Sequence, residues 1–179
     1  MAQNLSDTTA LLERTPGALA ALLGGLPEAW THRNEGDGTF TVAEVVGHLI
    51  YADKADWIPR ARRILNDGET VPFDPFDRRG HVPDCLGKSL PQLLDEFARV
   101  RAECLDALRA LHLKPEQMTL RGKHPSLGAV TLSELLATWA AHDLTHLHQI
   151  SRIMAQVYRN EVGPFEKFLG VMKCNAHGG

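Results

Sequence analysis

Residues 131–158 decide the fold: they read Thr131-LSELLATWAAHDLTHLHQISRIMAQV-Tyr158. Thr131 and Glu134 form a Thr-x-x-Glu capping box, in which two side chains satisfy backbone N–H groups at a helix start. Apolar residues then recur at three- and four-residue spacing, which is the period of a helix with one buried face. The segment therefore predicts one helix of roughly 28 residues, about 42 Å long at 1.5 Å per residue.

Three other segments carry similar helical signals. Residues 41–65 begin with a Thr-x-x-Glu box and residues 89–111 with a Ser-x-x-Gln box, and both continue with an apolar stripe. Residues 5–23 have a leucine-rich face and end at two glycines. Pro16 lies inside this segment, where it also suits the first turn of a second helix. We expect a bend near Pro59 in the second segment.

Four amphipathic helices in one short chain predict an all-α fold, a four-helix bundle with long inter-helix loops. No segment shows the alternation of a half-buried strand, and no repeat is present, so we expect a single domain over residues 1–179. Two connections are long, residues 66–88 and 113–130. A loop of that size in a compact domain is typically functional or disordered. The apolar residues of the first connection favour a loop that packs down and shapes a substrate pocket; they are Val71, Phe73 and Phe76.

Composition narrows the class of protein. The chain has 179 residues, of which 44% are apolar and 23% charged, as in ordinary soluble domains. The formal charge of −3 argues against a partner bound through phosphate neutralisation, so we expect no nucleic acid. The chain has three cysteines and no Cys-x-x-Cys pair, which argues against a disulfide framework and against a thiolate zinc site. No long apolar stretch or signal-peptide pattern occurs, so we expect a cytoplasmic protein without a membrane span.

The chain contains nine histidines, a high count that motivates a search for metal-ligand spacing. His142 and His146 are four residues apart, so on a helix both side chains point the same way, one turn apart. Both lie on the inward stripe, between Trp139 and Ile150. His148 lies about 200° round the helix from His146 and is excluded from the site. The pair has the spacing to chelate one metal ion.

A mononuclear site needs a third ligand from another helix, and His48 is the candidate. It lies among apolar residues of the second predicted helix, in Val45-Val-Gly-His48-Leu49. His124, in the loop before the last helix, is the competitor. The alternative is that these histidines are hydrogen-bonded core residues, although burying neutral imidazoles costs free energy unless both ring nitrogens find partners. The remaining histidines fall in predicted loops, helix ends or the tail; they are His32, His81, His112 and His177.

Other candidate residues give weaker signals. Asp53 and Asp56 follow His48 on the same helix, and we expect them to face solvent; the alternative is that they approach the site. Cys104 lies on an apolar stripe and is interpreted as a core residue. The last helix lacks the Glu of a His-Glu-x-x-His protease motif, because Asp143 follows His142. The sequence contains no phosphate-binding glycine loop, nucleophile elbow or catalytic triad, and it identifies no general base.

With these residues in hand, the sequence resembles the DinB/YfiT-like superfamily of small bacterial metal-binding bundles. The most specific match is a histidine in the second helix, Glu44-Val-Val-Gly-His48-Leu, together with His142-Asp-Leu-Thr-His146-Leu-His-Gln-Ile in the last. The matching stretches also include residues 56–62, 72–78, 124–136 and 162–165.

The resemblance implies a bundle that holds one divalent metal, zinc or nickel, on three histidines, which map to His48, His142 and His146. Members of this superfamily include metal-dependent transferases that use low-molecular-weight thiols, such as bacillithiol S-transferases and the mycothiol-dependent maleylpyruvate isomerase. The family name derives from a DNA-damage-inducible gene and implies no DNA binding. The resemblance also implies a homodimer, for which the C-terminal segment offers an apolar patch of Phe165, Phe168 and Leu169.

Three neutral nitrogen ligands leave metal positions open, as in catalytic rather than structural zinc sites. An open divalent metal lowers the pKa of a water or thiol, and the thiolate is the nucleophilic form. The sequence thus favours a thiol-dependent S-transferase acting on a small-molecule substrate. The alternatives are a metal-dependent hydrolase, a non-catalytic metal-binding or stress-response protein, and a bundle whose histidines are only core residues.

Overall fold

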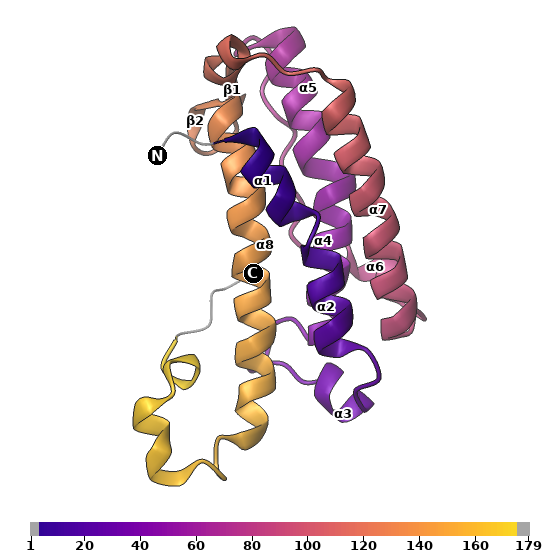
Figure 1. The fold of residues 1–179 in the computed structure, drawn as a ribbon, viewed down its shortest axis with the longest axis vertical. Coiled ribbons are helices and arrows are strands. Elements are labelled where there is room, and N and C mark those ends of the chain that lie inside the picture. Colours follow the sequence, from indigo (N-terminus) through magenta and orange to yellow (C-terminus); the bar gives the residue numbers. More distant parts are fainter. Residues whose placement is uncertain (1–3, 175–179) are drawn as a thin grey trace.

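The computed structural model describes residues 4–174 and has four long helical arms (Figure 1). The first arm consists of α1 (Leu5–Leu12) and α2 (Thr15–Leu23), the second of α4 (Val42–Ala52), a π-helical turn (Asp53–Trp57) and α5 (Ile58–Asp67), the third of α7 (Leu90–Ala110) and the fourth of α8 (Leu132–Ala155). This confirms the predicted all-α four-helix bundle.

Short elements connect and extend the arms. They are α3 (Glu28–Thr31), α6 (Val82–Cys85), and 3₁₀ turns at Pro115–Thr119, Gln156–Tyr158, Gly163–Phe168 and Gly170–Met172. The last predicted helix therefore ends as an α-helix at Ala155 and tightens into a 3₁₀ turn up to Tyr158. The C-terminal segment leaves the end of α8 and turns back beside it (Figure 1).

The predicted capping boxes are present at the starts of three arms. At α8, the backbone N–H of Glu134 donates to Thr131 Oγ1 (3.1 Å) and that of Thr131 donates to Glu134 Oε2 (2.7 Å). The same reciprocal pair joins Thr41 and Glu44 at α4. At α7 the backbone N–H and the Oγ of Ser89 both donate to Gln92 Oε1, at 2.8 and 3.1 Å. These local bonds explain why the helix starts were readable in the sequence.

Two helix irregularities differ from the simplest prediction. The first arm is two helices, because the chain breaks after Leu12 and restarts with Pro16 in the first turn of α2. In the second arm, the irregular stretch is the π-helical turn Asp53–Trp57, and Pro59 follows it in the first turn of α5. A π-helical turn adds one residue to a turn of helix, which changes the face that later residues present.

The prediction that the chain has no strand was wrong. Within the connection 113–130, β1 (Arg121–His124) pairs antiparallel with β2 (Gly128–Thr131), and Gly122 lies opposite Val130. The hairpin packs closely on its neighbours, because a Cβ at Gly122 would lie 2.7 Å from Ile64 and 2.8 Å from Phe73. Two four-residue strands are too short to give a clear alternating pattern.

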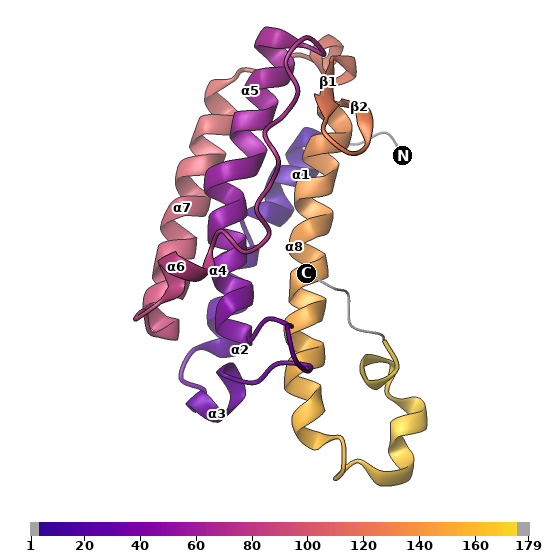
Figure 2. The same cartoon turned by 180° about the vertical axis from the view of Figure 1, so that it is seen from behind.

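The connection 66–88 packs against the bundle, as expected. Figure 2 shows it descending from α5 to α6 along the second arm. Phe73 is buried and its backbone N–H donates to the carbonyl of Lys123 in β1 (2.9 Å), whereas Val71 is exposed. The connection and the hairpin thus form one wall beside the bundle.

The core consists of two apolar clusters. One contains Trp57 and Trp139, and the other contains Leu49 and Ile150. Cys104 packs against both, which agrees with its interpretation as a core residue. In the part of the chain from residue 4 to 174, no helix has the combination of length and apolarity that crossing a membrane requires.

Candidate metal centre

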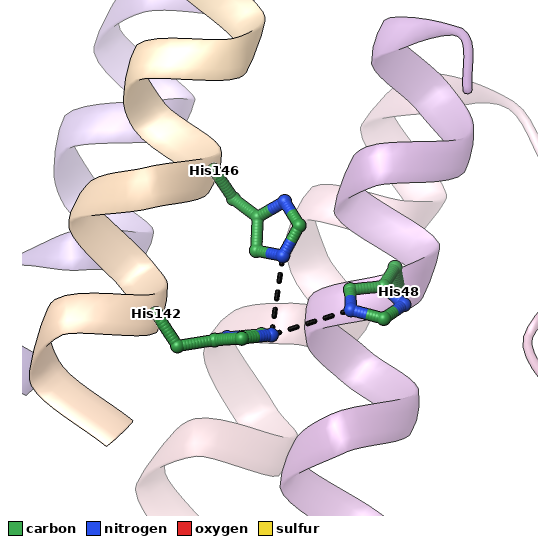
Figure 3. A group of neighbouring side chains, drawn as sticks. All are labelled: His48, His142 and His146. Atoms are coloured by element: carbon green, nitrogen blue, oxygen red, sulfur yellow. Dashed lines mark hydrogen bonds between the residues drawn. The ribbon is translucent and has the colours of Figure 1, made fainter. Parts of the chain in front are cut away.

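Three histidine side chains meet between α4 and α8 (Figure 3). His142 Nε2 lies 3.1 Å from His146 Nε2 and 3.3 Å from His48 Nε2. His48 and His146 are buried and His142 is partly buried. Among residues 4–174, no other group of three His, Cys, Asp or Glu side chains brings its ligand atoms this close together. The structure therefore assembles the three residues that the sequence singled out, and no others.

Gln149 fixes the orientation of His146. Its Oε1 atom lies 2.8 Å from His146 Nδ1, and both side chains are buried. An amide oxygen only accepts, so neutral His146 carries its proton on Nδ1 and directs the lone pair of Nε2 toward the other two rings. A hydrogen-bonded outer nitrogen of this kind is the usual partner of a metal-binding histidine.

The arrangement of the three Nε2 atoms is explained better by a shared metal ion than by hydrogen bonds between the rings. His142 Nε2 faces two other Nε2 atoms, but one N–H group makes only one strong hydrogen bond, so at least one close nitrogen pair lacks a proton between its members. Two nitrogens bound to one zinc ion at about 2.0–2.1 Å in a tetrahedral arrangement lie about 3.3 Å apart. The two spacings to His142 Nε2 agree with that value, and all three ligand atoms lie within 4.8 Å of one another, so the donor set fits one divalent ion.

Burial keeps the three rings neutral. Loss of hydration, together with the neighbouring histidines, lowers the pKa of His48 to about 3 and that of His142 to about 2. Burial also lowers the pKa of His146, against the opposing effects of Gln149 and Asp143. Metal binding requires neutral imidazole, so the site holds its ligands in the binding form.

A buried ionic network supports α8 directly beside His142. The side chains of Arg101, Asp53 and Asp143 are each at most 1% exposed. Arg101 forms two-pronged bonds to both carboxylates, at 2.7 and 3.1 Å to Asp53 and at 2.5 and 2.9 Å to Asp143. Trp139 Nε1 also donates to Asp53 (3.0 Å). This network ties α4, α7 and α8 together at the level of the triad.

The prediction that Asp53 and Asp56 face solvent was wrong: Asp53 pairs with the buried Arg101, and the π-helical turn redirects Asp56. Asp53 lies five residues after His48, about 140° round the helix, which directs it to Arg101. In a regular helix Asp56 would lie about 80° from His48, whereas one extra residue in the π turn brings it back to within about 20°. Asp56 is 8% exposed and lines the same cavity as His48.

A cavity of about 610 Å³ opens onto the triad, and we call it the site cavity. Its walls come from the second arm, α8, the connection 73–78 and the hairpin tip 124–127. The apolar lining residues include Trp57, Phe73, Phe76, Leu127, Val130 and Leu135, and the ionisable ones besides the histidines are Asp56, Arg60, Arg78 and Glu134. A volume of this size suits a small organic molecule.

The other histidines lie outside the triad. His124 lines the cavity from the hairpin, where its Nδ1 accepts from the backbone N–H groups of Ser126 and Leu127 (both 3.2 Å). His148 is on another face of α8 and is not a cavity residue. His177 lies outside the described residues.

Two groups of residues in or beside the site were not predicted from the sequence. His81 is fully buried, with its ring 5.5 Å from that of His48 and 4.7 Å from that of Phe40. Its place in a long connection gave no local signal of burial. Asp56 and Arg60 form an i,i+4 ion pair in the cavity wall, a spacing visible in the sequence but uninformative without knowledge of the π turn.

Comparison with known proteins places this arrangement in a family. The chain is similar to the solved structure of YfiT from Bacillus subtilis, described as a probable metal-dependent hydrolase with an unusual four-helix bundle topology. The two are 20% identical, the match covers 86% of this chain and 87% of that one, and the TM-score is 0.72. No curated protein matches the chain. Residues 11–150, which include all three triad histidines, match the model of the DinB superfamily. The chain belongs to the DinB superfamily.

Proposed function

We propose that this protein is a metal-dependent enzyme that acts on a small molecule, with His48, His142 and His146 as the ligands of one divalent metal, zinc or nickel. The observation that carries the proposal is the convergence of three histidine nitrogens, all within 4.8 Å of one another, on the wall of the site cavity. A structural metal site uses four protein ligands, whereas three leave room for a reactant.

The chain's own residues prepare the site for a polar reaction. When bound, a divalent metal with an open position lowers the pKa of a coordinated water or thiol and so supplies a nucleophile. Gln149 holds His146 in the correct tautomer, and burial keeps all three imidazoles neutral. Trp57 and Phe76 provide apolar wall beside the triad, and a less polar surrounding strengthens electrostatic interactions at the site.

For the reaction, we propose transfer of a low-molecular-weight thiol to an electrophilic substrate. The cavity has room for two small reactants side by side. Its mainly apolar lining suits the carbon skeleton of an electrophile and disfavours hydrolysis by bulk water. We propose the cytoplasm as its location, because cytoplasmic thiols are kept reduced.

Hydrolysis is the second candidate. The similarity of this fold to YfiT, described as a probable metal-dependent hydrolase, favours it. The same three histidines would serve both reactions, and the difference lies in whether water or a thiol is the nucleophile.

A paired assay distinguishes the candidates. Zinc- or nickel-loaded protein is incubated with cysteine or glutathione and the electrophile monochlorobimane, and separately with p-nitrophenyl acetate and no thiol. The proposal predicts metal-dependent consumption of thiol that His142→Ala abolishes. Ester cleavage alone would establish the hydrolase. Bound metal without either activity would identify a non-catalytic metal-binding protein, and no bound metal would leave the histidines as core residues.

A further inference from the structure

The site cavity contains a charged pair that the triad does not use. Asp56 and Arg60 lie one turn apart on the second arm, and Arg60 Nε is 2.5 Å from Asp56 Oδ1. Each side chain is only 11% exposed, and both line the cavity. Burying an ion pair costs several kcal/mol of desolvation per ion, so a pair that only stabilised the fold would be replaceable by apolar residues.

Contacts on two sides hold the Arg60 guanidinium in one place. The planar group lies over the ring of Phe73, with 5.2 Å from Cζ to the ring centroid. Its Nε edge faces Asp56, and Nη2 lies 3.5 Å from the carbonyl of Asp74. Within the described part of the chain, Nη1 of Arg60 has no hydrogen-bond partner. A fixed guanidinium with spare donors is the usual binding group for a carboxylate.

The charge of the cavity favours an anionic ligand. Its ionisable lining consists of two cations, Arg60 and Arg78, and two anions, Asp56 and Glu134, besides neutral histidines. Glu134 is already engaged in the helix cap with Thr131. The lining is therefore balanced without a metal, and a divalent ion on the triad would make the cavity positive by two charges.

We propose that Arg60 binds the carboxylate of the substrate through the donors that its contact with Asp56 leaves unused. The substrate class is a small carboxylic acid with an apolar body, which fits the wall of Phe73, Phe76 and Leu135. Asp56 lies eight residues from His48 on one face, roughly 12 Å along the arm. The acid group is thus held at a distance from the reacting end. This inference rests on the proposed function, because it names the substrate class of the same cavity.

Calorimetric titration of 4-phenylbutyrate against its neutral analogue 4-phenylbutyramide tests the assignment without any knowledge of the reaction. Wild-type protein is expected to bind the acid at least about tenfold more tightly than the amide, since a charge-assisted pair exceeds a neutral hydrogen bond. Arg60→Gln is expected to remove this preference while the amide still binds, which also shows that the variant folds. The exposed Arg62 on the same helix provides the matched control, because Arg62→Gln retains the preference.

A carboxylate also binds metals, so the titration is repeated on metal-free His142→Ala protein. Persistence of the preference for the acid in that variant supports Arg60 as the binding group, and loss of the preference there would assign the carboxylate to the triad metal and overturn the inference. Equal binding of acid and amide by the wild type, or a preference that survives in Arg60→Gln, would also overturn it. Because binding is measured without turnover, failure of the proposed catalysis leaves this result interpretable.

Discussion

His48 and His142 are ninety-four positions apart in the chain, and their Nε2 atoms lie 3.3 Å apart between two different helices. Neither α4 nor α8 supplies all three ligands. His142 and His146 provide two donors on α8, and the third arrives only when α4 packs against it (Figure 3). The centre is therefore a product of tertiary packing, and each of its parts is testable separately.

Removal of either α8 ligand is expected to abolish tight metal binding. His142→Ala and His146→Ala should each weaken zinc affinity by more than about 100-fold, which exceeds the 10–100-fold effect typical of losing a ligand's hydrogen-bond partner. Helix content should be unchanged, because the bundle is held by its apolar clusters. Competition with a chelator and far-UV circular dichroism measure the two effects. His148→Ala is the control, and full metal stoichiometry in either triad variant would refute the assignment.

We expect His48, and not His124, to be the third ligand. His48→Ala should reduce metal affinity by orders of magnitude, since two histidines on one helix bind weakly and reversibly. His124→Ala should leave affinity nearly unchanged, because His124 is bonded within its own turn. Isothermal titration with zinc compares them. The reverse ranking would move the third ligand to the hairpin.

The contribution of the triad to the stability of the metal-free protein is expected to fall as pH falls below 6.5. In the fold, burial lowers the pKa of His48 to about 3 and that of His142 to about 2, whereas the unfolded chain holds the ordinary value of 6.5. The unfolded chain therefore binds protons first, and this contribution is lost as pH falls from about 6.5 toward about 3. His142→Asn should lose less stability over the same range in thermal melts.

Asp53 and Asp56 change the pH dependence of stability in the opposite direction to the histidines. Burial raises the pKa of each carboxyl to about 6, so the folded chain takes up these protons first and gains stability as pH falls toward 4. Both proteins share these carboxyls, so the difference between them isolates the triad. Parallel pH profiles for wild type and His142→Asn would contradict the assignment of neutral, buried rings.

Arg101 is expected to be essential for stability. Arg101→Met leaves Asp53 and Asp143 buried without a cation and should lower the free energy of unfolding by about 3–5 kcal/mol. Arg99→Met on the same helix removes an exposed ion pair with Glu103 and should cost less than about 1 kcal/mol. Urea denaturation measures both. Equal effects at the two positions would show that the buried network contributes nothing specific.

The homodimer remains a prediction, and the C-terminal segment provides its test. Phe165 and Phe168 are 69% and 73% exposed, so these two rings do not close the end of the bundle. We expect them to meet a second copy, and light scattering at micromolar concentration should give a dimer mass. Phe165→Ser with Phe168→Ser should give a monomer. A monomer mass for the wild type would end the proposal.

The four arms and the triad could be predicted because their signals are local. Capping boxes such as Thr131 with Glu134 involve neighbours in sequence, and the spacing of His142 and His146 fixes their direction on any helix. His48 was identified by its apolar surroundings on a predicted buried face. These inferences needed only the helical period.

The rest depended on tertiary structure. The segment 53–57 contains ordinary helix residues, so nothing in it announced the π turn that buries Asp56 beside the cavity. His81 is buried because a long connection folds onto α4. The path of a loop produces no periodic pattern of apolar residues, so this burial could not be predicted from the sequence. The hairpin could not be predicted because its strands are only four residues long. A glycine is needed at position 122 because Phe73 lies too close for a Cβ atom, and this contact is visible only in the folded structure.

Anomalous scattering from crystals of the zinc- or nickel-loaded protein, recorded at the absorption edge of the metal, would locate the bound ion itself. We expect one anomalous peak between α4 and α8, about 2.0–2.1 Å from the Nε2 atoms of His48, His142 and His146 if the metal is zinc. A peak elsewhere, or no peak between these helices in crystals grown with excess metal, would contradict this expectation.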